Sequence, residues 1–179
     1  MLIVDAHLDL AWNALQWNRN IQHSVYTIRT GESNLSGAGR GQGTVALPEM
    51  RQGRIALCFA TLLARSTGRT IQNIDYSSPY QAYAVAQGQL AYYRALNEAG
   101  KVRLISNRKE LDEHLDAWFD WELDTTQAQP PVGLVISMES NRFSAELRKE
   151  FIMKSRRSVY ATLVALSFLV LETGMAWAQ

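Results

Sequence analysis

Three apolar segments of strand length constrain the fold of this chain more than any other feature. They are residues 2–4, 55–63 and 132–138, in which aliphatic side chains dominate. Apolar runs of this kind are typical of strands that are buried on both faces, as in parallel sheets. Helix-forming segments separate the second run from the third, and strands that alternate with helices favour parallel pairing through right-handed crossovers. The sequence therefore predicts an α/β fold.

Two helices are predicted between the second and third apolar segments. Ser78 and Pro79 are typical of a helix start, and the helix is expected over residues 80–99. After a short strand at residues 102–105, a second helix is expected over residues 108–118, capped by the preceding asparagine. In the first helix, apolar positions recur at helical spacing and are expected to face the core, and in the second, acidic and basic residues share the solvent face.

The segment between the first two strands looks different. Residues 13–46 are rich in Asn, Gly, Ser, Thr and Gln and show no sustained periodicity. This composition predicts a long surface loop. A short helical turn is expected at residues 47–50, before the second strand.

Charge and cysteine content exclude several classes of protein. The chain has 18 basic and 17 acidic residues, so it has no general attraction for nucleic acid, and no nucleic-acid partner is expected. The single cysteine, Cys58, lies in an apolar run and is expected to be a buried, unreactive thiol. A chain without disulfides fits a reducing compartment, and we expect the body of the protein to be cytoplasmic.

Charged residues follow two of the predicted strands at the point where each ends. His7 and Asp9 follow the first strand, and Glu139 follows the third. Side chains two positions apart on a strand point to the same face, so His7 and Asp9 are expected to converge. One imidazole and one carboxylate suit a borderline ion such as zinc. Glu139 adds a second carboxylate at the sheet end where barrel enzymes keep their ligands.

Three motifs give the chain a specific resemblance. Residues 4–12 (VDAHLDLAW) resemble the opening DxHxDLxW strand of the membrane (renal) dipeptidase family. Residues 45–53 (VALPEMRQG) resemble the DLPRLREGG turn of that family, and residues 133–139 (GLVISME) resemble its GxVLSMEG strand. The resemblance covers residues 1–140, and the motifs occur in the same order as in the family.

The resemblance implies a fold and an activity. Members of this family are amidohydrolase-like metallopeptidases on a TIM-like (β/α) barrel, and they hydrolyse dipeptides with water activated by two zinc ions. By resemblance, His7 and Asp9 would bind one zinc ion and Glu139 would bridge both. Residues 1–140 are then expected to form the first strands and helices of such a barrel, with a dipeptide as substrate.

Later parts of the family's site have no counterpart in this sequence. The resemblance implies further histidines from later strands and a late aspartate, but the chain has only His7, His23 and His114, and no aspartate follows Asp124. His23 and His114 are expected on the surface. A complete barrel typically needs ~250 residues. At 179 residues, we expect a truncated peptidase with low or no activity alone.

The end of the chain has a different character. Residues 141–152 form a junction, and residues 153–179 resemble a signal peptide, with a basic start, an apolar stretch at 159–171 and a small-x-small end. The stretch is shorter than the ~20 residues that span a bilayer. It is a membrane-seeking helix, a core helix covering the incomplete sheet, or a fragment of another reading frame joined to a truncated gene; we favour the last.

A non-catalytic role is the alternative to a dipeptidase. An incomplete barrel leaves strand edges unpaired, which favours self-association or pairing with another chain. The alternative is therefore an interaction fragment, or a fragment that associates with membranes through residues 153–179.

Overall fold

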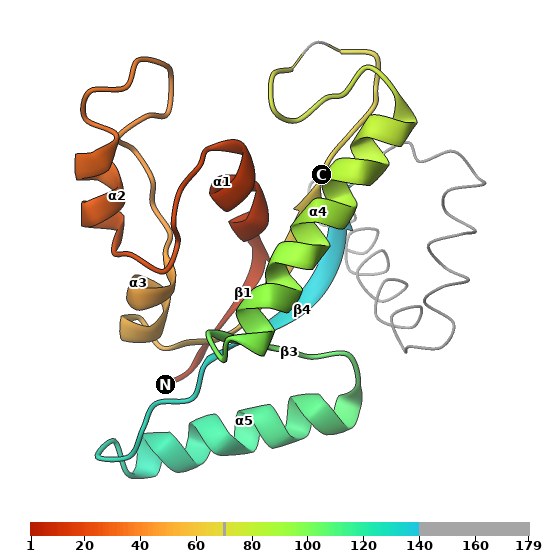
Figure 1. The fold of residues 1–179 in the computed structure, drawn as a ribbon. Coiled ribbons are helices and arrows are strands. Elements are labelled where there is room, and N and C mark those ends of the chain that lie inside the picture. The colour runs from red at the N-terminus through yellow and green to blue at the C-terminus, as the bar shows by residue number, and fades with distance from the viewer. Residues whose placement is uncertain (70, 140–179) are drawn as a thin grey trace, which may run out of the picture.

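A sheet of four parallel strands forms the centre of the structure (Figure 1). The computed structural model describes residues 1–69 and 71–139. The strands are β1 (Ile3–Leu8), β2 (Ile55–Leu63), β3 (Val102–Leu104) and β4 (Val132–Glu139), and their order in the sheet is β1-β2-β4-β3. Every neighbouring pair is parallel, so the predicted α/β fold with parallel pairing is confirmed.

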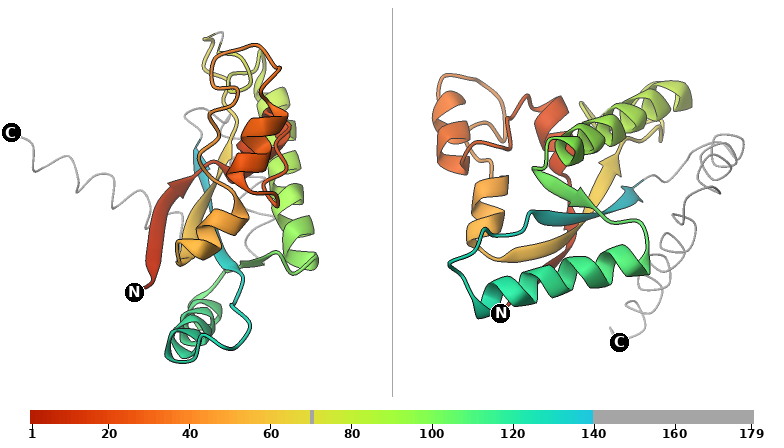
Figure 2. Two further views of the ribbon diagram at one scale, coloured as in Figure 1. Left: turned by 90° about the vertical axis from the view of Figure 1, so that its left-hand side faces the viewer. Right: turned by 60° about the horizontal axis from the view of Figure 1, so that its bottom comes forward.

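Helices cover the two faces of the sheet unequally (Figure 2). Helices α1 (Leu10–Gln16), α3 (Leu47–Gln52) and α4 (Pro79–Glu98) share the main hydrophobic core with one face. Helix α5 (Arg108–Leu123) lies at the amino ends of the strands, where Leu111 packs against a smaller cluster on the other face. That cluster consists of Leu57, Ile105 and Val135.

Strand β2 lies between β1 and β4, and its side chains are largely buried on both faces of the sheet. Cys58, Ala60 and Leu62 point into the main core, whereas Leu57 belongs to the smaller cluster. Seven consecutive residue pairs join β2 to β4, from Leu57↔Gly133 to Leu63↔Glu139. The prediction of buried strands at residues 55–63 and 132–138 is therefore confirmed.

The prediction of a buried first strand is wrong. Strand β1 pairs only with β2, so it is an edge strand of the described sheet. Ile3 is 41% exposed and Val4 is 55% exposed. The apolar side chains of residues 2–4 indicate a strand, but sequence does not show whether a second strand covers its outer edge.

Residues 13–46 are more ordered than their composition predicts. Helix α1 extends into this segment, and helix α2 (Val25–Gly31) lies within it, with Ser24 as its N-cap. A buried cluster of ion pairs holds the segment together, because the Glu32 carboxylate accepts hydrogen bonds from Arg19 and Arg40. The prediction of a long surface loop is therefore wrong where α1 and α2 lie, although much of the segment is at the surface.

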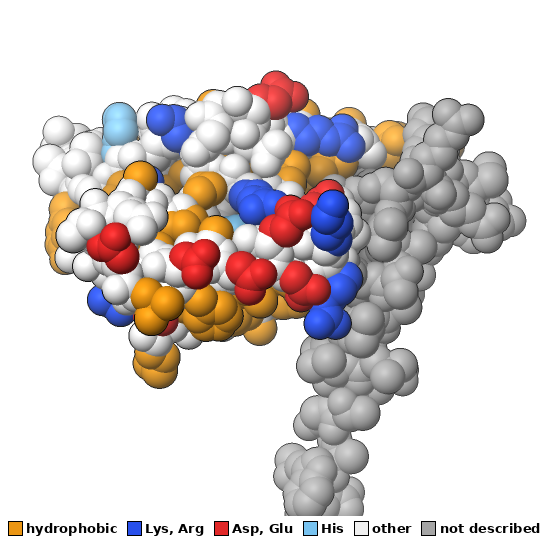
Figure 3. Space-filling view, turned by 90° about the horizontal axis from the view of Figure 1, so that it is seen from below, with side chains coloured by type: hydrophobic (Ala, Val, Ile, Leu, Met, Phe, Trp, Pro, Cys, Tyr) orange, Lys and Arg blue, Asp and Glu red, His pale blue; other side chains and the backbone are white. Residues whose placement is uncertain are grey.

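The two long helices confirm their predicted starts. Ser78 accepts a hydrogen bond from the Gln81 N–H at the beginning of α4, and Asn107 accepts one from the Glu110 N–H at the beginning of α5. Helix α5 continues beyond residue 118 to Leu123. Seen from below, acidic side chains form a row on the face that α5 presents, with hydrophobic side chains beside them (Figure 3).

None of the helices in the described part of the chain has both the length and the apolar character that a bilayer span requires. The predicted junction at residues 141–152 and the signal-peptide-like segment at residues 153–179, with its apolar helix, lie outside the described residues.

Candidate metal centre

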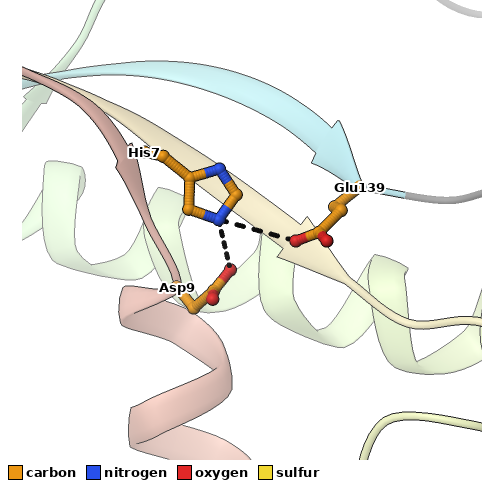
Figure 4. A group of neighbouring side chains, drawn as sticks. All are labelled: His7, Asp9 and Glu139. Atoms are coloured by element: carbon orange, nitrogen blue, oxygen red, sulfur yellow. Dashed lines mark ion pairs between the residues drawn. The ribbon is translucent and has the colours of Figure 1, made fainter.

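Three potential metal ligands meet at the carboxyl end of the sheet (Figure 4). His7 belongs to β1, Asp9 is the residue between β1 and α1, and Glu139 is the last residue of β4. The Nε2 atom of His7 lies 3.6 Å from Oδ1 of Asp9 and 3.5 Å from Oε2 of Glu139. The structure thus brings together the three residues that the sequence singles out.

Parallel pairing explains why residues so distant in sequence converge. Leu8 of β1 pairs with Ala60 of β2, and Leu63 of β2 pairs with Glu139 of β4. Because all three strands run in the same direction, their carboxyl ends lie at one edge of the sheet. His7 and Asp9 are two positions apart in the chain, and their side chains lie on the same side of that edge.

The two distances from His7 match those expected between ligands of one zinc ion. Two atoms that each lie about 2.1 Å from a tetrahedral ion are separated by about 3.4 Å. The two histidine distances are close to this value, and one ligand atom from each of the three residues lies within 4.8 Å of the others. Three protein ligands would leave a fourth position for water or substrate, as catalytic zinc sites do.

The cluster is accessible to solvent, as a site for a small substrate must be. The side chains of His7 and Glu139 are 55% and 45% exposed, whereas the Asp9 side chain is 26% exposed. The His7 backbone N–H donates a hydrogen bond to the Asp5 carboxylate at 2.9 Å. This bond stabilises the backbone of β1 at the residue that carries the imidazole.

Asp9 occupies the N-cap position of α1 but does not cap that helix with its side chain. An N-cap aspartate normally accepts a hydrogen bond from one of the first free N–H groups of its helix. Here the N–H of Ala11 donates instead to the hydroxyl of Tyr93, at 2.9 Å. The Asp9 carboxylate instead lies 3.6 Å from Nε2 of His7 and accepts a hydrogen bond from the hydroxyl of Thr61.

Thr61 and Tyr93 were not among the predicted site residues. Both are buried, with exposures of 1% and 0%, and the Tyr93 hydroxyl donates to the Thr61 carbonyl at 3.1 Å. Tyr93 lies in the apolar stripe of α4, which the sequence indicates only as core. Thr61 does leave a trace in the sequence, because it is the one hydroxyl residue within the apolar run at residues 55–63.

The other two histidines lie apart from the cluster. His23 is exposed, as predicted. The prediction of a surface position for His114 is wrong, because this side chain is 1% exposed and its Nε2 atom lies 2.8 Å from the carbonyl oxygen of Ala56. Burial lowers the pKa of His114, which favours a neutral imidazole that donates to this carbonyl.

Cys58 is buried in the main core, as predicted. Burial raises the pKa of its thiol to about 12, so the nucleophilic thiolate is not formed near neutral pH. Cys58 therefore belongs to the packing of β2 rather than to the chemistry of the site.

Comparisons with known proteins give no relative for this chain: no protein-family model matches it, and neither a curated protein nor a solved structure matches it significantly.

Proposed function

We propose that His7, Asp9 and Glu139 bind zinc and that the chemistry of this site is the metal-assisted hydrolysis of dipeptides. The observation that carries the proposal is the meeting of one imidazole and two carboxylates at the carboxyl edge of a parallel sheet. Barrel enzymes build their active sites at this edge. The motifs around all three residues resemble those of the membrane (renal) dipeptidase family.

Each residue has a role that follows from its position. His7 offers Nε2 to the ion, and Asp9 offers the carboxylate that Thr61 holds in place. Glu139 is the last residue of β4 and its side chain is half exposed, so its two oxygens can serve two ions, as the resemblance implies. A bound zinc ion would polarise the peptide carbonyl and activate a water molecule near neutral pH.

We infer further that β1, β2 and β4 are the first strands of a TIM-like barrel, and that β3, which pairs with β4 out of chain order, is not one of its successive strands. Three helices pack on one face, as on the outside of a barrel, and the candidate ligands lie at the carboxyl ends of the strands. The sequence has no histidine after His114, so the second metal position of the family lacks its histidine ligands here. For this reason, we expect weak zinc binding and little or no dipeptidase activity from the 179-residue chain alone.

Zinc binding to ligand variants tests the proposed site. We expect the purified chain to bind zinc in calorimetric or competitive-chelator titrations, and His7→Ala, Asp9→Asn or Glu139→Gln to weaken the binding at least about 10-fold. His23→Ala is the matched control because His23 is exposed and lies outside the cluster. Equal zinc affinity of the wild type and the three ligand variants would contradict the proposal.

A dipeptidase assay on the zinc-loaded chain tests the expected activity. The expected result is hydrolysis close to the background, and any residual activity should disappear in Glu139→Gln. Turnover at ordinary enzymatic rates, about 1–1000 per second, would overturn the expectation of low activity. It would support the proposed chemistry at the same time.

An interaction fragment is the second candidate, and the exposed edge strand favours it. Ile3 and Val4 of β1 present apolar side chains to solvent. Such an edge can pair with another chain.

We propose a cytoplasmic location for the body of the protein, supported by its single cysteine, Cys58. Flotation with lipid vesicles, with and without residues 153–179, tests membrane association: flotation that the deletion abolishes would support it, and no flotation of the full chain would exclude it.

A further inference from the structure

We infer that Thr61 and Tyr93 are positioning residues that hold the Asp9 carboxylate in the metal-ligand cluster. This inference rests on the proposed zinc site and extends it to residues that do not contact the ion. It starts from the way helix α1 begins, where an aspartate at the N-cap leaves the capping of the helix to another side chain.

Tyr93 takes over the task that the Asp9 side chain would otherwise perform. A free N–H at the beginning of a helix needs an acceptor, and an N-cap aspartate supplies one in most helices. The Tyr93 hydroxyl accepts from the Ala11 N–H at 2.9 Å and donates to the Thr61 carbonyl at 3.1 Å. With that N–H satisfied, the Asp9 carboxylate is available to the cluster.

Thr61 fixes the direction of the carboxylate. Its Oγ1 atom is in hydrogen-bond contact with Oδ1 of Asp9 and lies 3.3 Å from the carbonyl oxygen of Leu8. A hydroxyl has one proton, and donation to Leu8 would leave two oxygen atoms in unfavourable contact at Asp9. The hydroxyl therefore donates to Asp9. A carboxylate oxygen has two lone pairs, so Oδ1 can accept from Thr61 and still face the ion.

The central position of Thr61 makes it suited to this role. Thr61 belongs to β2 and pairs with Ser137 of β4, two residues before Glu139. It therefore lies between the strand that carries His7 and the strand that carries Glu139. Outer residues that orient metal ligands typically change metal affinity by about 10- to 100-fold when they are replaced.

Replacement of the Thr61 hydroxyl tests the inference. Thr61→Val keeps the shape of the side chain but removes the donor, whereas Thr61→Ser keeps the donor. We expect Thr61→Val to weaken zinc binding about 10- to 100-fold in a competitive-chelator titration, and Thr61→Ser to stay within about 3-fold of the wild type. Thr30→Val is the control for loss of a threonine hydroxyl at an exposed position.

A double-mutant cycle separates positioning from simple structural support. If Thr61 acts through Asp9, then Thr61→Val should have little further effect on zinc affinity in an Asp9→Asn background. Equal loss in both backgrounds would overturn the inference, as would equal affinities for Thr61→Val and Thr61→Ser. Absence of zinc binding by the wild type would overturn both this inference and the proposed function, whereas zinc binding that depends on His7, Asp9 and Glu139 but not on Thr61 would overturn only this inference.

Discussion

At the scale of single residues, Glu32 shows how charge organises the segment between β1 and β2. The Arg19 guanidinium donates to both oxygens of this buried carboxylate, and Arg40 and the Gly41 N–H add two further hydrogen bonds. The hydrogen bonds from Arg19, followed by those from Arg40 and Gly41, outweigh the cost of burial and lower the pKa of Glu32 to about 2. The side chain in the folded protein therefore stays ionised at pH values well above 2.

This pKa predicts the pH dependence of stability. The pKa of Glu32 is lower in the folded state than its ordinary value of 4.5, so its contribution is complete above pH 4.5 and is lost as the pH falls toward 2. The difference corresponds to about 3 kcal/mol. Glu32→Gln should reduce the free energy of unfolding by about 3 kcal/mol or more at pH 7, because two arginines lose their counter-charge.

Urea denaturation between pH 7 and pH 3 measures this effect. The difference in unfolding free energy between the wild type and Glu32→Gln should shrink as the pH falls below 4.5. Glu98→Gln is the control, because Glu98 is exposed at the end of α4. A constant difference across this pH range would show that Glu32 does not contribute through its charge.

Single residues also mark where sequence reasoning succeeds and fails. His7, Asp9 and Glu139 can be found because each follows an apolar run, where a polar side chain is conspicuous. Thr61 and Tyr93 cannot be assigned to the site in this way, because their importance depends on hydrogen bonds between strand and helix. His114 has charged neighbours in sequence, yet it faces β2, and only the packing of α5 shows this.

At the scale of elements, Gly133 sets how closely α5 approaches β4. A Cβ atom at this position would lie 2.5 Å from Nε2 of His114 and 2.8 Å from Cδ1 of Ile105. We therefore expect Gly133→Ala to destabilise the protein by at least about 2 kcal/mol, because the sheet and α5 must separate. The free energy of unfolding from urea denaturation measures this effect.

Gly88 provides the matched control in another element. It is exposed within α4, and a Cβ atom there would have no neighbour within 4 Å. Gly88→Ala should stabilise the protein by about 0.5–1 kcal/mol, because alanine favours the helical state. If both alanine substitutions had the same effect on stability, close packing at Gly133 would not be the cause.

Local chemistry explains why the helices could be predicted more accurately than the edge of the sheet. The side chains of Ser78 and Asn107 accept hydrogen bonds from N–H groups only three residues away. The starts of α4 and α5 therefore depend on neighbouring residues that can be recognised in the sequence. The neighbours of a strand come from distant segments. For this reason, residues 2–4 predict β1 as a strand but not as an edge, and the polar composition of residues 13–46 hides the buried ion pairs.

At the scale of the whole molecule, the open edge of β1 predicts self-association. Among residues 1–69 and 71–139, β1 has a neighbouring strand on one side only. Val4→Lys places a charge on this edge and should lower the tendency to associate, because edge lysines disfavour pairing with another chain. Sedimentation velocity over a range of concentrations measures this tendency.

Leu35→Lys is the control for added charge. Leu35 is 53% exposed, close to the 55% of Val4, but it lies outside the strands of the sheet. We expect Leu35→Lys to associate as the wild type does. Equal behaviour of both lysine variants and the wild type would argue against pairing through β1.

The placement of the ligands at both ends of the described chain has a consequence for biosynthesis. His7 and Asp9 leave the ribosome first, whereas Glu139 follows only after β2, α4 and α5 have been made. The nascent chain therefore carries two ligands without the third for most of its synthesis. The proposed zinc ion, which needs all three ligands, would bind only after β4 has docked on β2, so metal loading would be a late event that reports on completion of the sheet.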